Sequence, residues 1–338
     1  RYTSKLRRER LKKLEPLTHS DQCTNHPEWN ESYYFVFYSK EHNLGGMTRL
    51  GFKPNKQEGM AFYFLFLPNG SAAGYNLVQK VEDYTNSLQV GGVIHNCKNS
   101  SQWNYRFQGN MIAVENSEDL PKVRENPTLI ANTLKVKIDI DFDPMNKVYE
   151  YSENMTPESL EIGKKAGDKH WEQIANLSGN IQIDNTNFPI KNTIGQRDHT
   201  YGVRDWTGVG NWLYYVVWFN KNLGINPAAI VTDDGRLSTG GFLFKNGENI
   251  PLKTINIVDQ KFRKDGIFPV SSELEIVDAL GESHQLKANV GPIIPVPFLD
   301  GEGNQSILVQ SLGNFELDGI KGGYGTFETL RKVKLDKK

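Results

Sequence analysis

The chain has 338 residues, of which 38% are hydrophobic, and its 39 basic and 40 acidic residues give a formal net charge of -1. This composition is typical of a globular protein with a hydrophobic core, and the balanced charge gives no support for a nucleic-acid partner. No apolar run approaches the ~20 residues that cross a bilayer, so we expect no integral membrane span.

The first predicted element is the basic stretch KLRRERLKKL, residues 5–14. Its leucines, Leu6, Leu11 and Leu14, lie loosely on one side of a helix. Two interpretations remain open: a solvated terminal helix, or a basic lid that makes a peripheral contact with a membrane surface.

The dominant pattern is an alternation of apolar and polar residues, bounded by Gly, Pro and Asn. It is clearest in LKVKIDIDF, where Val136, Ile138, Ile140 and Phe142 share one face. Strands are predicted over residues 33–38, 61–67, 134–142, 180–184, 211–219, 240–248 and 253–262. Their spacing predicts an all-β fold of antiparallel barrels or sandwiches with little helix.

A polar connector, TPESLEIGKKAGDKHWEQIA (156–175), interrupts this pattern. Thr156 and Pro157 suit a helix start, so the segment predicts the second helix. Because it separates two β-rich halves, we predict an N-terminal β domain over residues 20–155 and a C-terminal one over residues 170–338.

The motif GQRDHTYGVRDW (195–206) is the densest group of proton-active side chains in the chain. In a strand, alternation places Arg197, His199, Tyr201 and Asp205 on one face and Asp198 on the other. An imidazole beside a carboxylate suits general acid–base chemistry, and an arginine can hold a carboxylate ionised or stabilise an oxyanion.

The second Arg–Asp pair of the motif, Arg204 and Asp205, has a structural interpretation of equal weight. Such pairs often form cross-strand ladders that fasten the end of a barrel. For Asp198 and His199 we favour a functional role, because polar groups beside a very apolar strand are costly to bury unless they are paired.

That apolar strand, NWLYYVVWF (211–219), places Trp212, Tyr214 and Trp218 on one face. An apolar cavity with aromatic walls and a few polar groups is typical of a site for a hydrophobic small molecule. The alternative is ordinary core packing.

Two further groups of polar residues are candidates for the same site. Glu31, directly before the strand at 33–38, is a candidate to point into a cavity, with a turn or surface role as the alternative. His170 and Glu172 are candidates to face the site from a barrel rim.

The number and spacing of cysteines and histidines indicate whether the chain has a metal site and which cellular compartment suits it. Cys23 and Cys97 are the only cysteines, too few for a disulfide framework or a thiolate zinc site, so we predict reduced thiols in a cytoplasmic protein. Four histidines show no ligand spacing: His19, His42, His95 and His284. The sequence therefore predicts no metal site and no cofactor.

Several segments carry a family resemblance: HPEWNESYYF (26–35), GGMTRLGFKPN (45–55), HWEQ (170–173) and GQRDHTYGVRDW. From about residue 20 to 330 the chain resembles paired uncharacterised domains of bacterial and archaeal proteins. Those domains are similar to the lipocalin-like superfamily that includes hydroxyneurosporene synthase, the acyclic carotenoid hydratase, and tocopherol cyclase-like proteins. The resemblance implies two lipocalin-like β-barrel or sandwich domains packed together, with a ligand site between or inside them.

Within that resemblance, Asp198, His199, Tyr201 and Gly202 match a strand that carries a basic, an acidic and an aromatic residue. The closer pattern commonly has Trp where this chain has Tyr201, which weakens any transfer of substrate identity. Function inferred from fold analogy alone stays associational.

These observations together predict an enzyme: a cofactor-independent hydratase or dehydratase, or a related cyclase or isomerase, acting on a hydrophobic, isoprenoid-like alkene. Asp198 or Asp205 would donate the proton, His199 would orient or relay it, Arg197 would set the charge of the carboxylate, and Tyr201 would position water or substrate. The candidate substrate-binding residues are Glu31, Arg204, Trp206, Trp212, Tyr214 and Trp218. The alternative is a non-catalytic protein that binds or carries a hydrophobic ligand.

Overall fold

The computed structural model describes residues 17–99 and 102–333, so the basic segment at 5–14 lies outside the described residues. The fold is nearly all-β, as the alternation predicts, and its described part contains one α-helix, α2 (Pro157–Gly163). Short 3₁₀ turns lie at Ser20–Gln22, Pro54–Lys56, Ser117–Lys122, Pro127–Leu129, Tyr151–Glu153 and Lys164–Ala166. No helix in residues 17–99 and 102–333 combines the length and apolar character needed to cross a membrane.

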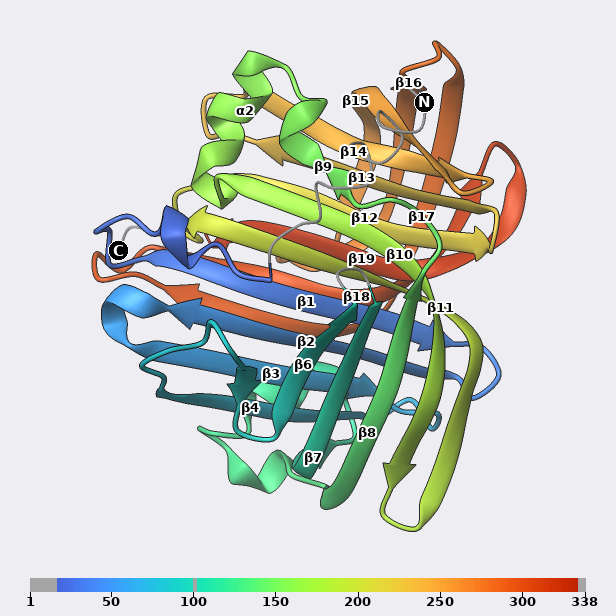
Figure 1. Cartoon of the computed structure of the whole chain (residues 1–338). Helices are drawn as coiled ribbons and strands as arrows, with labels where there is room; N and C mark the ends of the chain where they lie inside the picture. Colours follow the sequence, from blue (N-terminus) through green and yellow to red (C-terminus); the bar gives the residue numbers. More distant parts are fainter. Residues whose placement is uncertain (1–16, 100–101, 334–338) are drawn as a thin grey trace, which may run out of the picture.

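The first sheet is antiparallel and has 11 strands (Figure 1). They are β1 (Trp29–Ser39), β2 (Leu44–Lys53), β3 (Glu58–Phe66), β4 (Ala72–Lys80), β5 (Leu88–Val90), β6 (Val93–Asn99), β7 (Gln102–Val114), β8 (Asn132–Pro144), β9 (Tyr149–Glu150), β10 (Lys169–Ile183) and β11 (Thr186–Val203). Their order is β4-β3-β2-β1-β11-β10-β8-β7-β6-β5, with β9 beside β10. Because β4 also pairs with β7, the sheet curls around one hydrophobic core.

The second unit is a closed antiparallel barrel, in which β12 pairs with β19. Its strands are β12 (Asn211–Asn220), β13 (Leu223–Val231), β14 (Leu237–Lys245), β15 (Glu248–Phe262), β16 (Pro269–Asp278), β17 (Ser283–Leu299), β18 (Gln305–Leu317) and β19 (Ile320–Val333). Closure leaves no free strand edge in this barrel.

Strand β8 confirms the alternation, because Val136, Ile138, Ile140 and Phe142 are all buried while the residues between them face solvent. Strand β1 is buried on both faces instead. Its odd positions, such as Tyr33 and Phe35, pack inside the first sheet, and its even positions, such as Tyr34, face the second barrel. A continuous apolar run such as YYFVFY suits that position.

Another hydrophobic cluster packs part of the space between the first sheet and the second barrel. It joins side chains of β1–β3, β10 and β11 to side chains of β12, β14, β17 and β18. Trp218 on β12 is 1% exposed there, and its indole nitrogen donates to Gln196 Oε1 over 3.4 Å.

The sheet membership corrects the expected domain boundary. Strand β11, which carries most of the motif, pairs with β1, and its neighbour β10 pairs with β8, so both belong to the first sheet although the prediction placed them in the C-terminal domain. Alternation shows which face of a strand is buried but not which strand lies beside it. The chain leaves the first sheet only in the turns after Val203.

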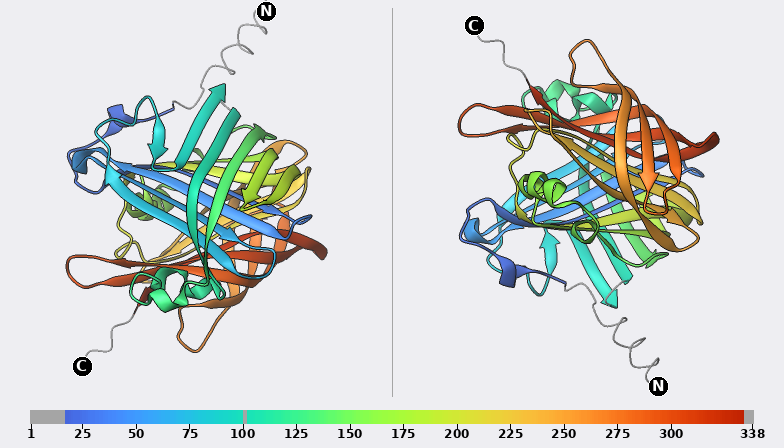
Figure 2. Two further views of the ribbon diagram at one scale, coloured as in Figure 1. Left: turned by 90° about the horizontal axis from the view of Figure 1, so that it is seen from below. Right: turned by 90° about the horizontal axis from the view of Figure 1, so that it is seen from above.

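The predicted helix over 156–175 is shorter than expected. It begins as predicted, with the Thr156 hydroxyl accepting from Ser159 N over 3.2 Å and Pro157 in the first turn. It ends at Gly163, and β10 starts at Lys169. The helix packs on the second barrel, where Ser238 Oγ donates to Ser159 O over 2.9 Å, and Figure 2 shows it lying over the strands.

The contact between sheet and barrel gives a stability prediction. We expect Trp218→Ala to lower the free energy of unfolding by about 3–5 kcal/mol, because it deletes a fully buried indole and leaves a cavity. Trp206→Ala, at a half-buried position, should cost less. Denaturant titration measures both, and equal losses would contradict a tightly packed interface at Trp218.

Candidate functional site

Strand β11 separates the motif into two sites on opposite faces. It lies between β1 and β10, with His199 opposite Tyr33 and Asp198 opposite Glu172. Arg197 and His199 point into the core of the first sheet, while Asp198 points towards the second barrel. The predicted alternation of faces is confirmed, but these three side chains cannot meet around one ligand.

A cavity of about 940 Å³ lies between the first sheet and the second barrel. Apolar and aromatic side chains of both units line it, among them Phe62, Phe64, Trp206, Trp212, Val296 and Phe298. Its size and lining suit a hydrophobic small molecule.

Three titratable groups from β10 and β11 gather at the polar side of this cavity. His170 Nε2 lies 2.9 Å from Glu172 Oε1, and one oxygen of Asp198 lies within 4.8 Å of both groups. Glu172 also accepts from Tyr214 and from Gln196 Nε2, the latter over 2.7 Å. Among the described residues, the Asp198 carboxyl has no hydrogen-bond partner, so it is available to a ligand in the cavity.

Burial sets the protonation states of this group. It raises the pKa of Glu172 to about 8 and that of Glu328, across the cavity, to about 7. The pKa of Asp198 is raised as well, chiefly by burial and further by Glu172. Burial lowers the pKa of His170 to about 4. At neutral pH the His170 imidazole is therefore neutral and the Glu172 carboxyl is mostly protonated.

Two arginines complete the polar lining. Arg49 is 8% exposed, and its guanidinium reaches Asn30 Oδ1 over 3.4 Å; burial lowers its pKa to about 9. The buried Nε of Arg204 has no hydrogen-bond partner, and within the described part of the chain neither arginine forms an ion pair. Their charges work against a metal cation at His170, Glu172 and Asp198.

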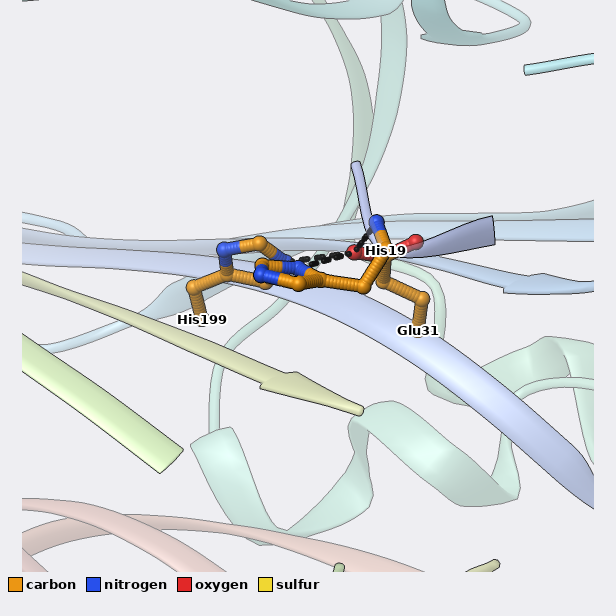
Figure 3. A group of neighbouring side chains, drawn as sticks. All are labelled: His19, Glu31 and His199. Atoms are coloured by element: carbon orange, nitrogen blue, oxygen red, sulfur yellow. Dashed lines mark hydrogen bonds and ion pairs between the residues drawn. The ribbon is translucent and has the colours of Figure 1, made fainter. Parts of the chain in front are cut away.

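The inner face of the motif builds a separate cluster (Figure 3). His199 Nε2 lies 2.8 Å from Glu31 Oε1, and His19 Nδ1 lies 3.1 Å from the same oxygen. The candidate role of Glu31 in the cavity is corrected, because its side chain points into the core of the first sheet and does not line the cavity.

Two other predicted catalytic residues, Tyr201 and Arg197, do not line the cavity. Tyr201 packs against His19, with ring centroids 4.8 Å apart, and Arg197 donates to Gln173 Oε1 over 3.1 Å. Asp205 also borders the cavity, but it is exposed in the turn after β11 and accepts from Gly208 N over 2.7 Å. The expected face that joined it to His199 is corrected, because β11 ends at Val203 and strand alternation stops there.

The predicted aromatic face of β12 is confirmed. Trp212 and Tyr214 line the cavity, while Trp218 continues that face into the packed interface. Trp206 lines the cavity from the preceding turn and stacks on Phe298 with centroids 4.4 Å apart. Arg204 and Asp205, for which the sequence leaves a structural and a site role open, both border the cavity.

Sequence reasoning missed the contributions of distant strands. Arg49, Gln310 and Glu328 reach the cavity from β2, β18 and β19, and Tyr34 OH donates to Gln310 Oε1 over 3.2 Å. The sequence offers His170 only as a candidate at the barrel rim. A polar residue inside an otherwise apolar strand, as in MTRLGF or VQSLG, is the available signal for such positions.

The raised carboxyl pKa values predict a pH dependence of stability. Folded Glu172 keeps its proton up to a pKa of about 8, whereas its ordinary pKa is 4.5. The folded state therefore binds more protons between these values, and the free energy of unfolding should fall as pH rises through this window. Denaturant titration at several pH values in this window should show that the free energy of unfolding depends less steeply on pH in Glu172→Gln than in wild type. In Glu328→Gln the dependence should be reduced by a smaller amount. Identical slopes for wild type and Glu172→Gln would contradict the prediction.

Comparison with solved structures shows a shared fold at low identity. An AttH candidate from Nitrosomonas europaea aligns with a TM-score of 0.61 and 11% identity, covering 94% of this chain and 95% of that one. Kievitone hydratase from Nectria haematococca aligns with a TM-score of 0.54 and 9% identity, covering 94% of each chain. CghA, which was also solved with Sch210972, aligns with a TM-score of 0.53 and 11% identity, covering 91% of this chain and 89% of that one.

Sequence comparison identifies the family. Among curated proteins, none matches this chain. The family model described as Domain of unknown function (DUF7064) matches residues 17–333, which include the first sheet, the second barrel and the cavity between them. The chain therefore belongs to the DUF7064 family.

Proposed function

We propose that this protein is an enzyme that adds water to, or removes water from, a double bond in a hydrophobic, isoprenoid-like substrate held in the cavity. The observation that carries the proposal is Asp198, a carboxyl of raised pKa that faces an apolar, aromatic cavity without a hydrogen-bond partner in the described chain. A protonated carboxylic acid in such surroundings is a suitable general acid.

The proposed reaction begins with proton transfer from the Asp198 carboxyl to one alkene carbon. The neighbouring carbon becomes a cation, which aromatic faces such as Trp212 and Phe62 stabilise. Water then forms a C–O bond at that carbon, and its extra proton returns to Asp198. The reverse sequence removes water, and loss of a proton from an adjacent carbon gives isomerisation.

His170 and Glu172 act as positioning residues in this scheme. Their hydrogen-bonded pair lies beside Asp198, and Thr200 Oγ1 holds His170 Nδ1 at 2.7 Å. Because Glu172 and Asp198 are close carboxyls, ionisation of one raises the pKa of the other and favours a protonated acid.

Arg49 and Arg204 indicate that the substrate also carries an anionic or strongly polar end. Buried cations without an ion-pair partner are costly, and a carboxylate or phenolate on the ligand would satisfy them. An anion bound there would also hold the pKa of Asp198 high.

Similar structures support an enzyme of this class, since one of them is a hydratase and another was solved with a small molecule. The resemblance of the motif to the carotenoid hydratase group supports an isoprenoid substrate.

The test is to incubate the purified protein with a bacterial lipid extract and to identify by mass spectrometry what it retains and what it changes. A product that differs from a retained compound by one water supports the proposal. A ligand that is retained and released unchanged would favour a carrier.

A further inference from the structure

The cluster of His19, Glu31 and His199 has the composition of a metal site. It combines two imidazole nitrogens with one carboxylate oxygen, and the three ligand atoms lie within 4.8 Å of one another. The distances from Glu31 Oε1 are 3.1 Å to His19 Nδ1 and 2.8 Å to His199 Nε2. In a tetrahedral zinc site with bonds of about 2.0–2.1 Å, ligand atoms lie roughly 3.3 Å apart, so small side-chain rotations admit an ion.

The charge and burial of the cluster favour a cation. Glu31 supplies the one acidic side chain of the cluster, and its Oε1 lies within hydrogen-bond distance of both imidazole rings. The side chains of Glu31 and His199 are fully buried, while that of His19 is 10% exposed and marks the side from which an ion would enter.

The surroundings match the outer shell of a metal site. Tyr84 OH donates to the second oxygen of Glu31 over 2.7 Å, which orients the carboxylate. Tyr33 stacks on His199 with centroids 4.3 Å apart, and Trp171 stacks on His19 at 4.8 Å. Outer-shell hydrogen bonds and an apolar casing of this kind fix the ligand rings and exclude water.

We propose that His19, Glu31 and His199 bind a divalent transition metal ion of the zinc class inside the first sheet. The ligands come from three segments: the chain before β1, strand β1 and strand β11 (Figure 3). The ion therefore ties the segment around His19 to the two central strands. This proposal stands apart from the cavity chemistry, because Glu31 and His199 lie on the opposite side of β1 and β11 from Asp198.

The experiment titrates the chelator-treated full chain with Co²⁺, whose visible d–d absorption reports tetrahedral N/O coordination, and then displaces it with Zn²⁺. We expect one ion per chain. The variants His19→Gln, Glu31→Gln and His199→Gln should each weaken Co²⁺ binding by more than ~100-fold, and Tyr84→Phe by ~10–100-fold.

Two matched controls locate the site. His42→Gln alters an exposed histidine whose Nε2 contacts Pro189 O at 2.8 Å, and His170→Gln alters the cavity cluster; both should bind Co²⁺ as wild type does. Because His19 lies outside the strands, His19→Gln should keep the β-sheet circular dichroism even where the other variants fail to fold. Absence of binding by wild type, binding that survives His19→Gln, or loss with His170→Gln alone would overturn the proposal.

Discussion

The Asp198→Asn variant is expected to retain the hydrophobic ligand and to lose turnover by ~10²–10⁴-fold. The amide has the shape of the acid but cannot transfer a proton to an alkene. Since the carboxyl makes no hydrogen bond to the described residues and lies near Glu172, its removal should leave the free energy of unfolding unchanged or raise it. Ligand retention, product formation and denaturant midpoint are measured on the same preparation.

The matched control is Asp205→Asn. Asp205 is the other aspartate of the motif that the sequence offers as proton donor, and it also borders the cavity. Unlike Asp198, however, it is exposed and caps Gly208 N, a role that asparagine can also fill. We expect this variant to turn over as wild type does. Turnover that survives Asp198→Asn, or that is lost in Asp205→Asn instead, would remove Asp198 from the acid role.

The fold was predictable from local pattern. Alternation in LKVKIDIDF and NWLYYVVWF identifies strands and their buried faces, because side-chain direction repeats every two residues whatever the strand's neighbours are. Sheet membership was not predictable in this way. The segment with α2 looks like a link between domains in the sequence because it leaves the first sheet and packs on the second barrel. The strands that follow it, β10 and β11, belong to the first sheet again.

The site was predictable only in part, for the same reason. The motif marks Asp198 and His199, but alternation could not show that each face of β11 builds its own cluster. His19 lies 180 residues from His199 by sequence number, and the two meet because β1 pairs with β11. Glu328 lies 130 residues from Asp198, and the two meet because the second barrel packs against the first sheet. Metal-ligand spacing therefore gives no signal for His19, Glu31 and His199.

The Arg204→Met variant should lose affinity for an anionic ligand without losing stability. Retinoic acid and its methyl ester are hydrophobic isoprenoid probes that differ in one charge. We expect wild type to prefer the acid, and the variant to lose about 2–5 kcal/mol of acid binding with little change for the ester, because a buried charge pair is broken on one side. Arg49→Met should act in the same sense. Fluorescence titration measures both probes.

The stability of the unliganded Arg204→Met protein distinguishes a ligand-binding role of Arg204 from a structural one. Its Nε is buried without a partner and its guanidinium lies 5.1 Å from the Trp206 ring, so an apolar side chain of similar length should stabilise the empty protein or leave it unchanged. Arg236→Met, which removes an exposed arginine paired with Asp234, is the control for a lost positive charge and should alter neither quantity. Suppose instead that Arg204→Met destabilises the empty protein and binds both probes as tightly as wild type does. Arg204 would then have a structural role, in which its charge is balanced by Asp198 and Glu328. In that case the cavity takes a neutral ligand.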